Sequence, residues 1–430
     1  MDAVDISTET ITLRRALSLR AAVALGVGGT IGGGIFVLVG NAAMLAGPSA
    51  LLAFGCAFVV ALLIALPYAE LACRYPAAGG GYAFVREILG REWGFLMGWV
   101  FWGAYVFISG YVTLGFGGYL NDLTGMPPLF GALGLVAACT LINIVGVRLS
   151  GQVQQAIILL ALAGLSGFVL LGLPSITVAH FHPWMPHGMA GAMSATLMAF
   201  LAFGGFDMVA AAGEEVARPE RNLPLAILLT LGIVLFVYLA VAFVALGTLG
   251  WRGLGQSSAP LADAACIFMG PDGKKGIALV AVLTMAATGN AVLVVTSRIC
   301  FAMARDGLLP KTLARVQADT GVPWAATLLS AGMLGAVALT GSLRMATAVG
   351  GFLYAMHFVP PLLVLMTLRK RDDGSPPFRM PLPTVLLPLA LGVSGIMLVA
   401  SGGTGMLGGL IWIGVGAGLR WVSPVVRRRS

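Results

Sequence analysis

The chain has 430 residues, of which 59% are hydrophobic and only 10% are charged. Soluble globular domains carry about 25% charged residues, so this composition excludes a soluble protein and indicates one that lies in a lipid bilayer. We attribute the net charge of +8 to membrane topology, and we therefore expect the lipid bilayer, and no nucleic acid, as a partner.

About twelve apolar stretches approach the length of about 20 residues that a helix needs to cross the hydrocarbon core. No linker or low-complexity segment divides them, which predicts an all-α polytopic membrane protein with one domain over residues 1–430. The predicted spans are residues 21–45, 48–72, 94–120, 127–147, 153–173, 193–213, 223–248, 276–303, 323–341, 344–368, 382–401 and 405–422.

The placement of basic residues tests this span count independently, because cytoplasmic loops collect lysine and arginine. If the amino terminus lies in the cytoplasm, most of the 25 basic residues fall on the inside, and the outside loops hold only Arg252, Lys274, Lys275 and Arg344. We therefore expect a multi-pass protein of the plasma membrane with both termini in the cytoplasm.

The first span contains the sequence GGTIGGGIF at residues 28–36, which is rich in glycine. Each glycine lowers helix stability by about 1 kcal/mol relative to alanine, so we expect the helix to break here. Irregular backbone inside a membrane is tolerated only where protein covers it or where it lines a polar cavity. The break therefore predicts a binding site.

The sixth span is interrupted in a comparable way at Gly204 and Gly205. The two breaks lie five spans apart, as in the inverted repeats of secondary transporters. We expect one repeat over about 21–173, a second over about 193–368, and two additional helices over about 382–422. The alternative for both clusters is tight helix packing, since small residues four apart let helices approach closely.

Backbone groups at the two breaks could bind an α-amino acid. A half-helix that begins at Gly32, Gly33 and Gly34 would turn free N–H groups and a positive dipole end toward a carboxylate. Carbonyl groups near Thr30 and Leu201 could accept an ammonium group. The predicted substrate-binding residues are Thr30, Ile31, Gly32, Gly33, Gly34, Leu201, Ala202, Phe203, Gly204 and Gly205.

Several polar residues in the spans are candidates for coupling or gating. Asp207 is the one acid predicted near mid-membrane, where an unpaired charge costs several kcal/mol. It is either a titratable gate or a cap of the second half of its helix. His357 could relay protons or contact substrate, or it could be a neutral histidine bonded to a carbonyl that the following prolines free. Thr284 and Thr288 share one helix face, where they would either bind sodium or bond their own backbone.

Glu214 and Glu215, with Arg218, Arg221, Arg298 and Arg305, are either an inner gate of salt bridges or ordinary interfacial charges. His180, His182 and His187 share one outside loop without an acid or cysteine nearby, so we expect no metal site there. We also expect no cofactor, apart from H⁺ or Na⁺ as a coupling ion.

At the level of whole motifs, the chain resembles permeases of the amino acid-polyamine-organocation superfamily, most closely the cationic-amino-acid-transporter-like branch. The resemblance covers nearly the whole chain. Six segments carry it: GVGGTIGGGIF (26–36), RYPAAGGGYAFVREILG (74–90), AFLAFGGFDMVAAAGEEVARPERNLPLAI (199–227), SRICFAMARDGLLP (297–310), GVPWAAT (321–327) and FRMPLP (378–383).

The resemblance implies the leucine-transporter-type fold, with five plus five inverted spans and two more. It implies that Gly33 and Gly34 meet the substrate carboxylate, and that Thr30 and the backbone from Leu201 to Gly204 meet its amine. The family often has serine or threonine at the place of Gly33, so this site would depend more on backbone. Proton-linked relatives carry a lysine at the place of Ala161, so this chain offers no lysine for coupling by that route.

We therefore predict a secondary active amino acid transporter, working by symport or exchange and by alternating access. Neutral substrates are favoured over cationic ones, because Asp207 is the one obvious counter-charge in the core. One alternative is a polyamine or other organic cation transporter of the same fold. An intramembrane enzyme is disfavoured because the spans lack HExxH, paired aspartates or a Ser-Lys pair. A channel would show flux without saturation, and no partner protein is indicated.

Overall fold

The computed structural model describes residues 17–75, 80–146, 151–211, 213, 216–317, 321–371 and 377–422. Within these ranges every regular element is a helix, apart from one isolated bridge between Leu17 and Val216. Eleven helical stretches are long and apolar enough to cross a membrane, and the shorter apolar helix α13 makes a twelfth candidate. An all-α polytopic membrane protein is thus confirmed.

The helices follow the predicted spans closely. The first half of the chain forms α1 (Leu19–Thr30), α2 (Gly33–Phe36), α3 (Leu38–Ala46), α4 (Ala50–Arg74), α5 (Gly81–Leu89), α6 (Arg91–Thr124), α7 (Pro128–Ile144) and α8 (Gly151–Gly172). The second half forms α9 (Gly188–Ala202), α10 (Phe206–Ala211), α11 (Pro219–Gln256), α12 (Pro260–Arg305), α13 (Trp324–Leu339), α14 (Leu343–Arg371), α15 (Pro383–Ala400) and α16 (Gly402–Val422).

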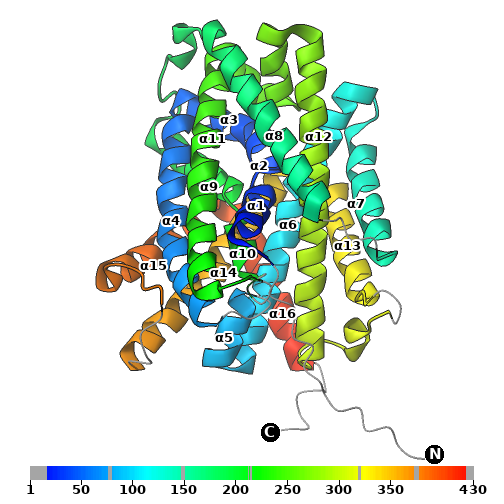
Figure 1. The fold of residues 1–430 in the computed structure, drawn as a ribbon, viewed down its shortest axis with the longest axis vertical. Coiled ribbons are helices and arrows are strands. Elements are labelled where there is room, and N and C mark those ends of the chain that lie inside the picture. The colour runs from blue at the N-terminus through cyan, green and yellow to red at the C-terminus, as the bar shows by residue number, and fades with distance from the viewer. Residues whose placement is uncertain are drawn as a thin grey trace, which may run out of the picture.

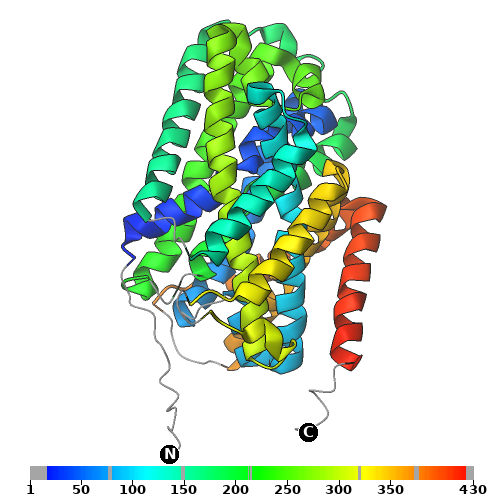
Figure 2. The same cartoon turned by 90° about the vertical axis from the view of Figure 1, so that its right-hand side faces the viewer.

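The short helices α1, α2 and α10 lie in the middle of the ribbon, with α4 and α11 on one side and α12 on the other (Figure 1). Helix α6 packs against α7, α12 and α14 and is buried along most of its length. Helices α7 and α13 lie side by side, and α16 runs along the outer edge (Figure 2). The broken helices are therefore enclosed by long, continuous ones.

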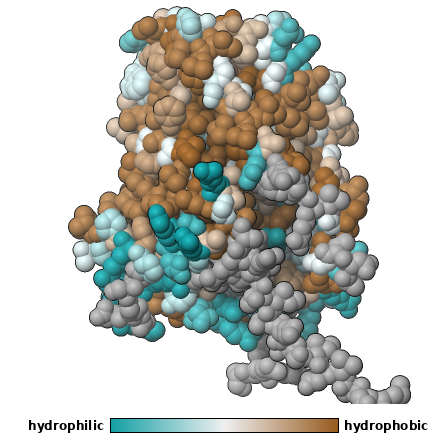
Figure 3. Space-filling view, in the orientation of Figure 1, coloured by the Kyte–Doolittle hydropathy of each residue, from teal (hydrophilic) through white to brown (hydrophobic). Residues whose placement is uncertain are grey.

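Hydrophobic residues form a broad band around the molecule, as expected for a surface that faces lipid, while hydrophilic residues gather toward the end that carries α5 (Figure 3). Helices α15 and α16 bury only 22% and 17% of their apolar windows inside the protein. The last helix is nevertheless fixed to the core. The indole N–H groups of Trp99 and Trp412 donate to each other's backbone carbonyls at 2.8 and 3.0 Å, and the two rings stack.

Two features lie outside the predicted spans. Helix α5 occupies part of the loop after the second span, and short helical extensions fill the loop between the predicted seventh and eighth spans. These extensions turn at Gly250 (φ +73°) and Gly270 (φ +69°), where the left-handed backbone suits glycine. The polar loops predicted from the sequence are thus partly helical.

Candidate functional site

The first membrane span is interrupted as the glycine run predicts. Helix α1 ends at Thr30, Ile31 adopts an extended backbone, and a new helical segment begins at Gly33. The N–H group of Ile31 still donates to Val27, but the N–H groups of Gly32, Gly33 and Gly34 meet no acceptor among the described residues. Three adjacent donors at the start of a helical segment are the arrangement that binds an anion.

Neighbouring helices approach these glycines so closely that a side chain would not fit. A Cβ atom on Gly32 would lie 2.3 Å from Oγ1 of Thr288, and one on Gly33 would lie 2.9 Å from the ring of Tyr111. A Cβ atom on Gly34 would lie 2.8 Å from the hydroxyl of Tyr238. The packing and the unwinding explanations of this glycine run therefore both hold.

The sixth span is interrupted at the same depth. Helix α9 ends at Ala202, residues 203–205 form a turn, and α10 begins at Phe206. Gly205 has φ +127°, and a Cβ atom there would lie 2.7 Å from the backbone carbon of Gly29. The two breaks therefore touch backbone to backbone, which requires glycine at this point.

Tyr238 of α11 joins the two breaks. Its hydroxyl lies 2.7 Å from the carbonyl oxygen of Thr30 and 2.9 Å from that of Ala202. A phenol has only one proton to donate, so the two carbonyls share it. The carbonyl of Leu201 accepts the N–H of Gly204 at 3.0 Å. Carbonyl groups that the sequence assigns to an ammonium group are thus gathered around a single O–H donor.

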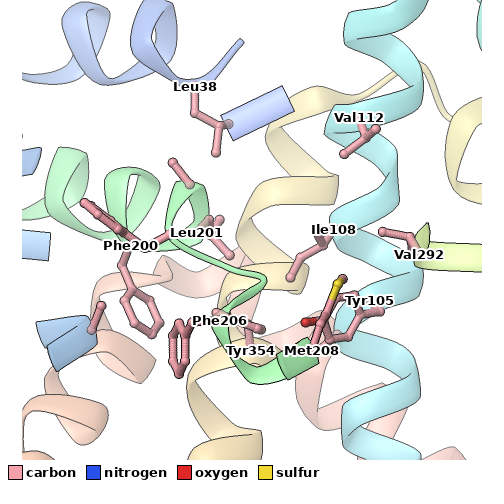
Figure 4. Packing of buried hydrophobic residues seen from close by; sticks show 14 of the residues in the cluster. Leu38, Tyr105, Ile108, Val112, Phe200, Leu201, Phe206, Met208, Val292 and Tyr354 are labelled. Atoms are coloured by element: carbon pink, nitrogen blue, oxygen red, sulfur yellow. The ribbon is translucent and has the colours of Figure 1, made fainter. Parts of the chain in front are cut away.

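A small cavity lies beside the breaks. It is lined by Gly29, Tyr105, Ile108, Tyr111, Val112, Gly204, Met208, Thr288, Val292 and Tyr354, none of which is charged. Figure 4 shows Tyr105, Ile108 and Val112 on one helix, α6, and Met208 on α10. The cavity has a volume of about 10 Å³ for the centre of a water molecule. This is enough room for about one water molecule. This conformation is closed around the cavity.

Asp207 lies in the first turn of α10, directly after the break, and is completely buried. Its carboxylate accepts hydrogen bonds from the hydroxyl of Tyr105 at 2.9 Å, the hydroxyl of Tyr354 at 3.1 Å and the N–H of Gly205 at 3.2 Å. The acid thus caps the backbone at the break, and it also connects two tyrosines that line the cavity.

His357 lies opposite this acid on α14 and is also completely buried. Its Nδ1 is 2.7 Å from the carbonyl oxygen of Tyr354, and its Nε2 is 3.5 Å from Oδ2 of Asp207. Nε2 has no hydrogen-bond partner in the described structure. The histidine does bond a backbone carbonyl, but that carbonyl belongs to Tyr354 and is not one that the prolines free, because Pro360 and Pro361 lack the N–H groups that would bond Met356 and His357. The nearby carboxylate keeps the proton-relay interpretation open.

The other coupling and gating candidates are placed less distinctively. The hydroxyls of Thr284 and Thr288 donate to the backbone carbonyls four residues earlier in α12, at 2.6 and 3.0 Å. Threonine in membrane helices often bonds in this way. Glu214 and Glu215 lie outside the described residues, so the inner gate built on them stays a prediction.

Two other acids form networks near the ends of the spans. Glu70, completely buried at the end of α4, accepts from Arg74 at 3.1 Å, Arg369 at 2.5 Å and the N–H of Met380 at 2.9 Å. Asp306, which caps α12, accepts from Arg86 and from the hydroxyl of Tyr82 on α5.

The sequence interpretation missed the tyrosines. Tyr105, Tyr111, Tyr238 and Tyr354 are all buried and surround the two breaks. A buried phenol needs a hydrogen-bond partner, and in a membrane interior such partners are scarce. Tyrosine in the middle of an apolar span was therefore an available signal for the site.

Comparison with known proteins gives a consistent result. A family model described as Amino acid permease matches residues 17–412. The chain is 30% identical to the methylthioribose transporter of Bacillus subtilis, with 97% of this chain and 95% of that protein covered. It is 33% identical to human cationic amino acid transporter 4 (86% and 62% covered). It is 29% identical to the branched-chain amino acid permease BcaP of Bacillus subtilis (94% and 92% covered).

Proposed function

Because the chain belongs to the amino acid permease family, we propose that it is a secondary transporter that carries neutral amino acids across the plasma membrane by alternating access. The observation that carries this proposal is the pair of interrupted helices. They bring three N–H groups that have no acceptor among the described residues, and a cluster of carbonyl groups, next to a cavity whose lining residues are uncharged. The N–H groups suit the carboxylate of a zwitterion, and the carbonyl groups suit its ammonium group.

The substrate carboxylate would bind at the N–H groups of Gly32, Gly33 and Gly34. A helix start favours an anion by about 0.3 to 2 kcal/mol, depending on burial. The ammonium group would take the place of the Tyr238 hydroxyl between the carbonyls of Thr30 and Ala202. Backbone at Ile31, Phe203 and Gly205 would hold these groups in position.

The lining of the cavity suits an apolar side chain. Ile108, Val112, Met208 and Val292 supply its hydrocarbon surface (Figure 4). A cationic side chain would need a carboxylate, and Asp207 is already bonded to two tyrosines. The relatives' names include branched-chain amino acids, cationic amino acids and methylthioribose, so the lining residues carry the argument for a neutral amino acid.

Binding must be accompanied by a movement, since the cavity in this conformation holds about one water molecule. Tyr111 is the side chain that covers Gly33. We expect it to swing aside when the cavity opens, while α1, α2, α9 and α10 move against the long helices. The termini would lie in the cytoplasm, and the coupling would use H⁺, Na⁺ or exchange.

Uptake into liposomes tests the proposal. Purified protein is reconstituted, and uptake of radiolabelled leucine is competed with valine, lysine, putrescine and methylthioribose under imposed H⁺ or Na⁺ gradients. We expect saturable leucine uptake that valine inhibits and that lysine, putrescine and methylthioribose leave nearly unchanged. Saturable uptake of putrescine or methylthioribose without any uptake of amino acids would overturn it.

A matched pair of glycine variants shows whether uptake depends on the break. Gly34→Ala places a Cβ atom 2.8 Å from the Tyr238 hydroxyl and 2.9 Å from the carbonyl oxygen of Ala202, so it should abolish uptake. Gly134→Ala on α7 places its Cβ atom in open space and should transport like the unmodified protein. Equal uptake by both variants would count against a site at the break.

A further inference from the structure

The contact between Asp207 and His357 joins the broken sixth span to α14. Both side chains are completely buried, and the imidazole Nε2 lies 3.5 Å from the carboxylate Oδ2. The imidazole is held in place, because it stacks on Phe101 at a centroid distance of 4.9 Å and an angle of 8°, and it also contacts the ring of Phe358. Its Nε2 therefore stays directed at the acid.

Hydrogen-bond chemistry fixes the tautomer of this histidine. Nδ1 lies 2.7 Å from the carbonyl oxygen of Tyr354. A carbonyl only accepts, so Nδ1 must carry the proton, and Nε2 of the neutral ring has a lone pair. This lone pair faces a carboxylate oxygen and meets no hydrogen-bond partner in the described structure. A proton on Nε2 would turn an unfavourable contact between two acceptors into a charge-assisted hydrogen bond.

We propose that Asp207 and His357 together form the site that binds one proton during transport. This inference rests on the proposed transport function and names its coupling ion. The proton adds to Nε2 from the side to which the cavity is open, and the same N–H bond breaks when the proton leaves on the other side. No other bond changes. The loaded pair is neutral overall, whereas the empty pair leaves one negative charge in the membrane interior, which is costly to bury.

The groups around the pair allow this titration. The phenols of Tyr105 and Tyr354 donate to Asp207, and the hydroxyl of Tyr68 accepts the N–H of Gly81. Helices α9 and α15 carry no titratable side chain. The charged side chains on the other helices packed around the pair are exposed or occupied elsewhere. Arg20, Glu220, Arg221, Arg252 and Glu87 are exposed, Glu70 and Arg74 pair with each other, Arg86 bonds Asp306, and Arg420 bonds Glu92.

Two tyrosines connect the proton to the substrate. The hydroxyls of Tyr105 and Tyr354 donate to Asp207, and the same side chains line the cavity. When the protonated Nε2 of His357 donates to Oδ2 of Asp207, it can replace one of the two tyrosine hydroxyls as a donor to this carboxylate. A phenol can then turn toward the cavity and the break at Gly204. The Tyr354 hydroxyl is near this break, since a Cβ atom built on Gly204 would lie 3.2 Å from it. Proton binding thus changes the donors that the substrate meets.

The experiment measures proton entry and amino acid uptake in the same liposomes, with a pH-sensitive dye inside. We expect uptake to carry about one proton per substrate and to rise as the outside pH falls. His357→Gln should remove proton entry and flatten the pH profile. Asp207→Asn should flatten it in the same way.

A second histidine supplies the matched control. His180 also bonds a backbone carbonyl through Nδ1, at 2.8 Å, and no described acid forms an ion pair with it. His180→Gln should keep the pH profile and proton entry of the unmodified protein. If His357→Gln keeps both as well, or if His180→Gln loses them equally, the assignment is wrong.

Two further measurements separate this inference from the proposed function. Exchange of labelled for unlabelled amino acid without a gradient tests transport alone, and we expect the unmodified protein and His180→Gln to show it equally. No exchange in the unmodified protein would contradict the proposed function, whereas exchange without proton entry would contradict only the proton site. Should the variants not fold, the unmodified protein in weak buffer should take up protons when leucine is added near pH 7. If the pH of the weakly buffered solution does not change when leucine is added, the assignment is wrong.

Discussion

At the residue scale, the site depends on hydroxyl groups that hold two interrupted helices together. Tyr238 donates to carbonyls on both breaks at 2.7 and 2.9 Å, whereas Tyr111 reaches Leu201 only at 3.5 Å. Hydrogen-bond strength falls at such a distance. The two tyrosines therefore differ in what they contribute to the closed, substrate-free conformation.

This difference predicts the effect of removing each hydroxyl. Tyr238→Phe leaves buried carbonyls without a donor, which should lower the free energy of unfolding by about 1 to 3 kcal/mol. Tyr111→Phe should lower it by less than about 1 kcal/mol. Thermal unfolding in detergent without substrate measures both. Equal losses for the two variants would mean that Tyr238 does not bridge the breaks.

A second prediction concerns Gly33, where relatives of the resembled superfamily often have a hydroxyl residue. In this chain a Cβ atom at Gly33 would lie 2.9 Å from two ring carbons of Tyr111 and 3.2 Å from the Cα atom of Val112. Gly33→Ser should therefore reduce leucine uptake by about tenfold or more, equivalent to about 1.4 kcal/mol. Gly332→Ser on α13, which meets open space, should not.

The clash at Gly33 can be tested by relieving it. The double variant Gly33→Ser with Tyr111→Leu removes the ring that the new side chain would meet. It should unfold at a higher temperature than Gly33→Ser alone, because the two positions are in direct contact and their effects are not additive. Strict additivity of the two changes would contradict the packing described here.

At the element scale, the helix breaks were predictable from the sequence, but the side-chain contacts that hold the broken helices against their neighbours were not. Glycine at positions 32–34 and at 204–205 weakens helices locally, and the structure interrupts both spans there. The role of Tyr238 was not predictable, because it depends on α11 crossing both breaks. The contact between Asp207 and His357 likewise depends on the packing of α10 beside α14, which a single sequence does not specify.

The short helix α5 shows the same limit. Its sequence is part of a motif that pointed to the family, but its docking on the end of α12 appears only in three dimensions. Tyr82 donates to Asp306 at 2.5 Å, Arg86 bonds the same carboxylate, and Arg91 donates to the backbone carbonyl of Asp306 at 2.9 Å. Burial, and next the bond to Asp306, raise the pKa of Tyr82, so this phenol remains a donor at any physiological pH.

These bonds predict that Asp306 holds this end of the molecule closed. Asp306→Asn keeps the shape but removes the negative charge, so α5 should separate more readily from α12. We expect the buried Cys300 on α12 to react several times faster with a maleimide, relative to the unmodified protein. Asp272→Asn changes an exposed acid and should leave the rate unchanged. An unchanged rate for Asp306→Asn would show that this network does not gate access.

At the scale of the whole molecule, composition and the spacing of apolar stretches were sufficient for the fold class. The low charged fraction and the spacing of apolar stretches predicted a polytopic all-α protein, and the described residues form eleven helical stretches long and apolar enough to cross a membrane and one shorter candidate. The substrate class depends on finer features, namely which side chains line a closed cavity. Ile108, Met208 and Val292 come from three different helices, and their convergence was not visible in the sequence.

The central claim is that two interrupted helices bind the charged backbone of an amino acid. Competition of leucine uptake by leucine methyl ester and by N-acetyl-leucine tests it most directly, because each compound removes one charge and keeps the side chain. We predict that both compete at least about tenfold more weakly than leucine itself. Competition by the ester equal to that by leucine would contradict recognition of the carboxylate at Gly32, Gly33 and Gly34.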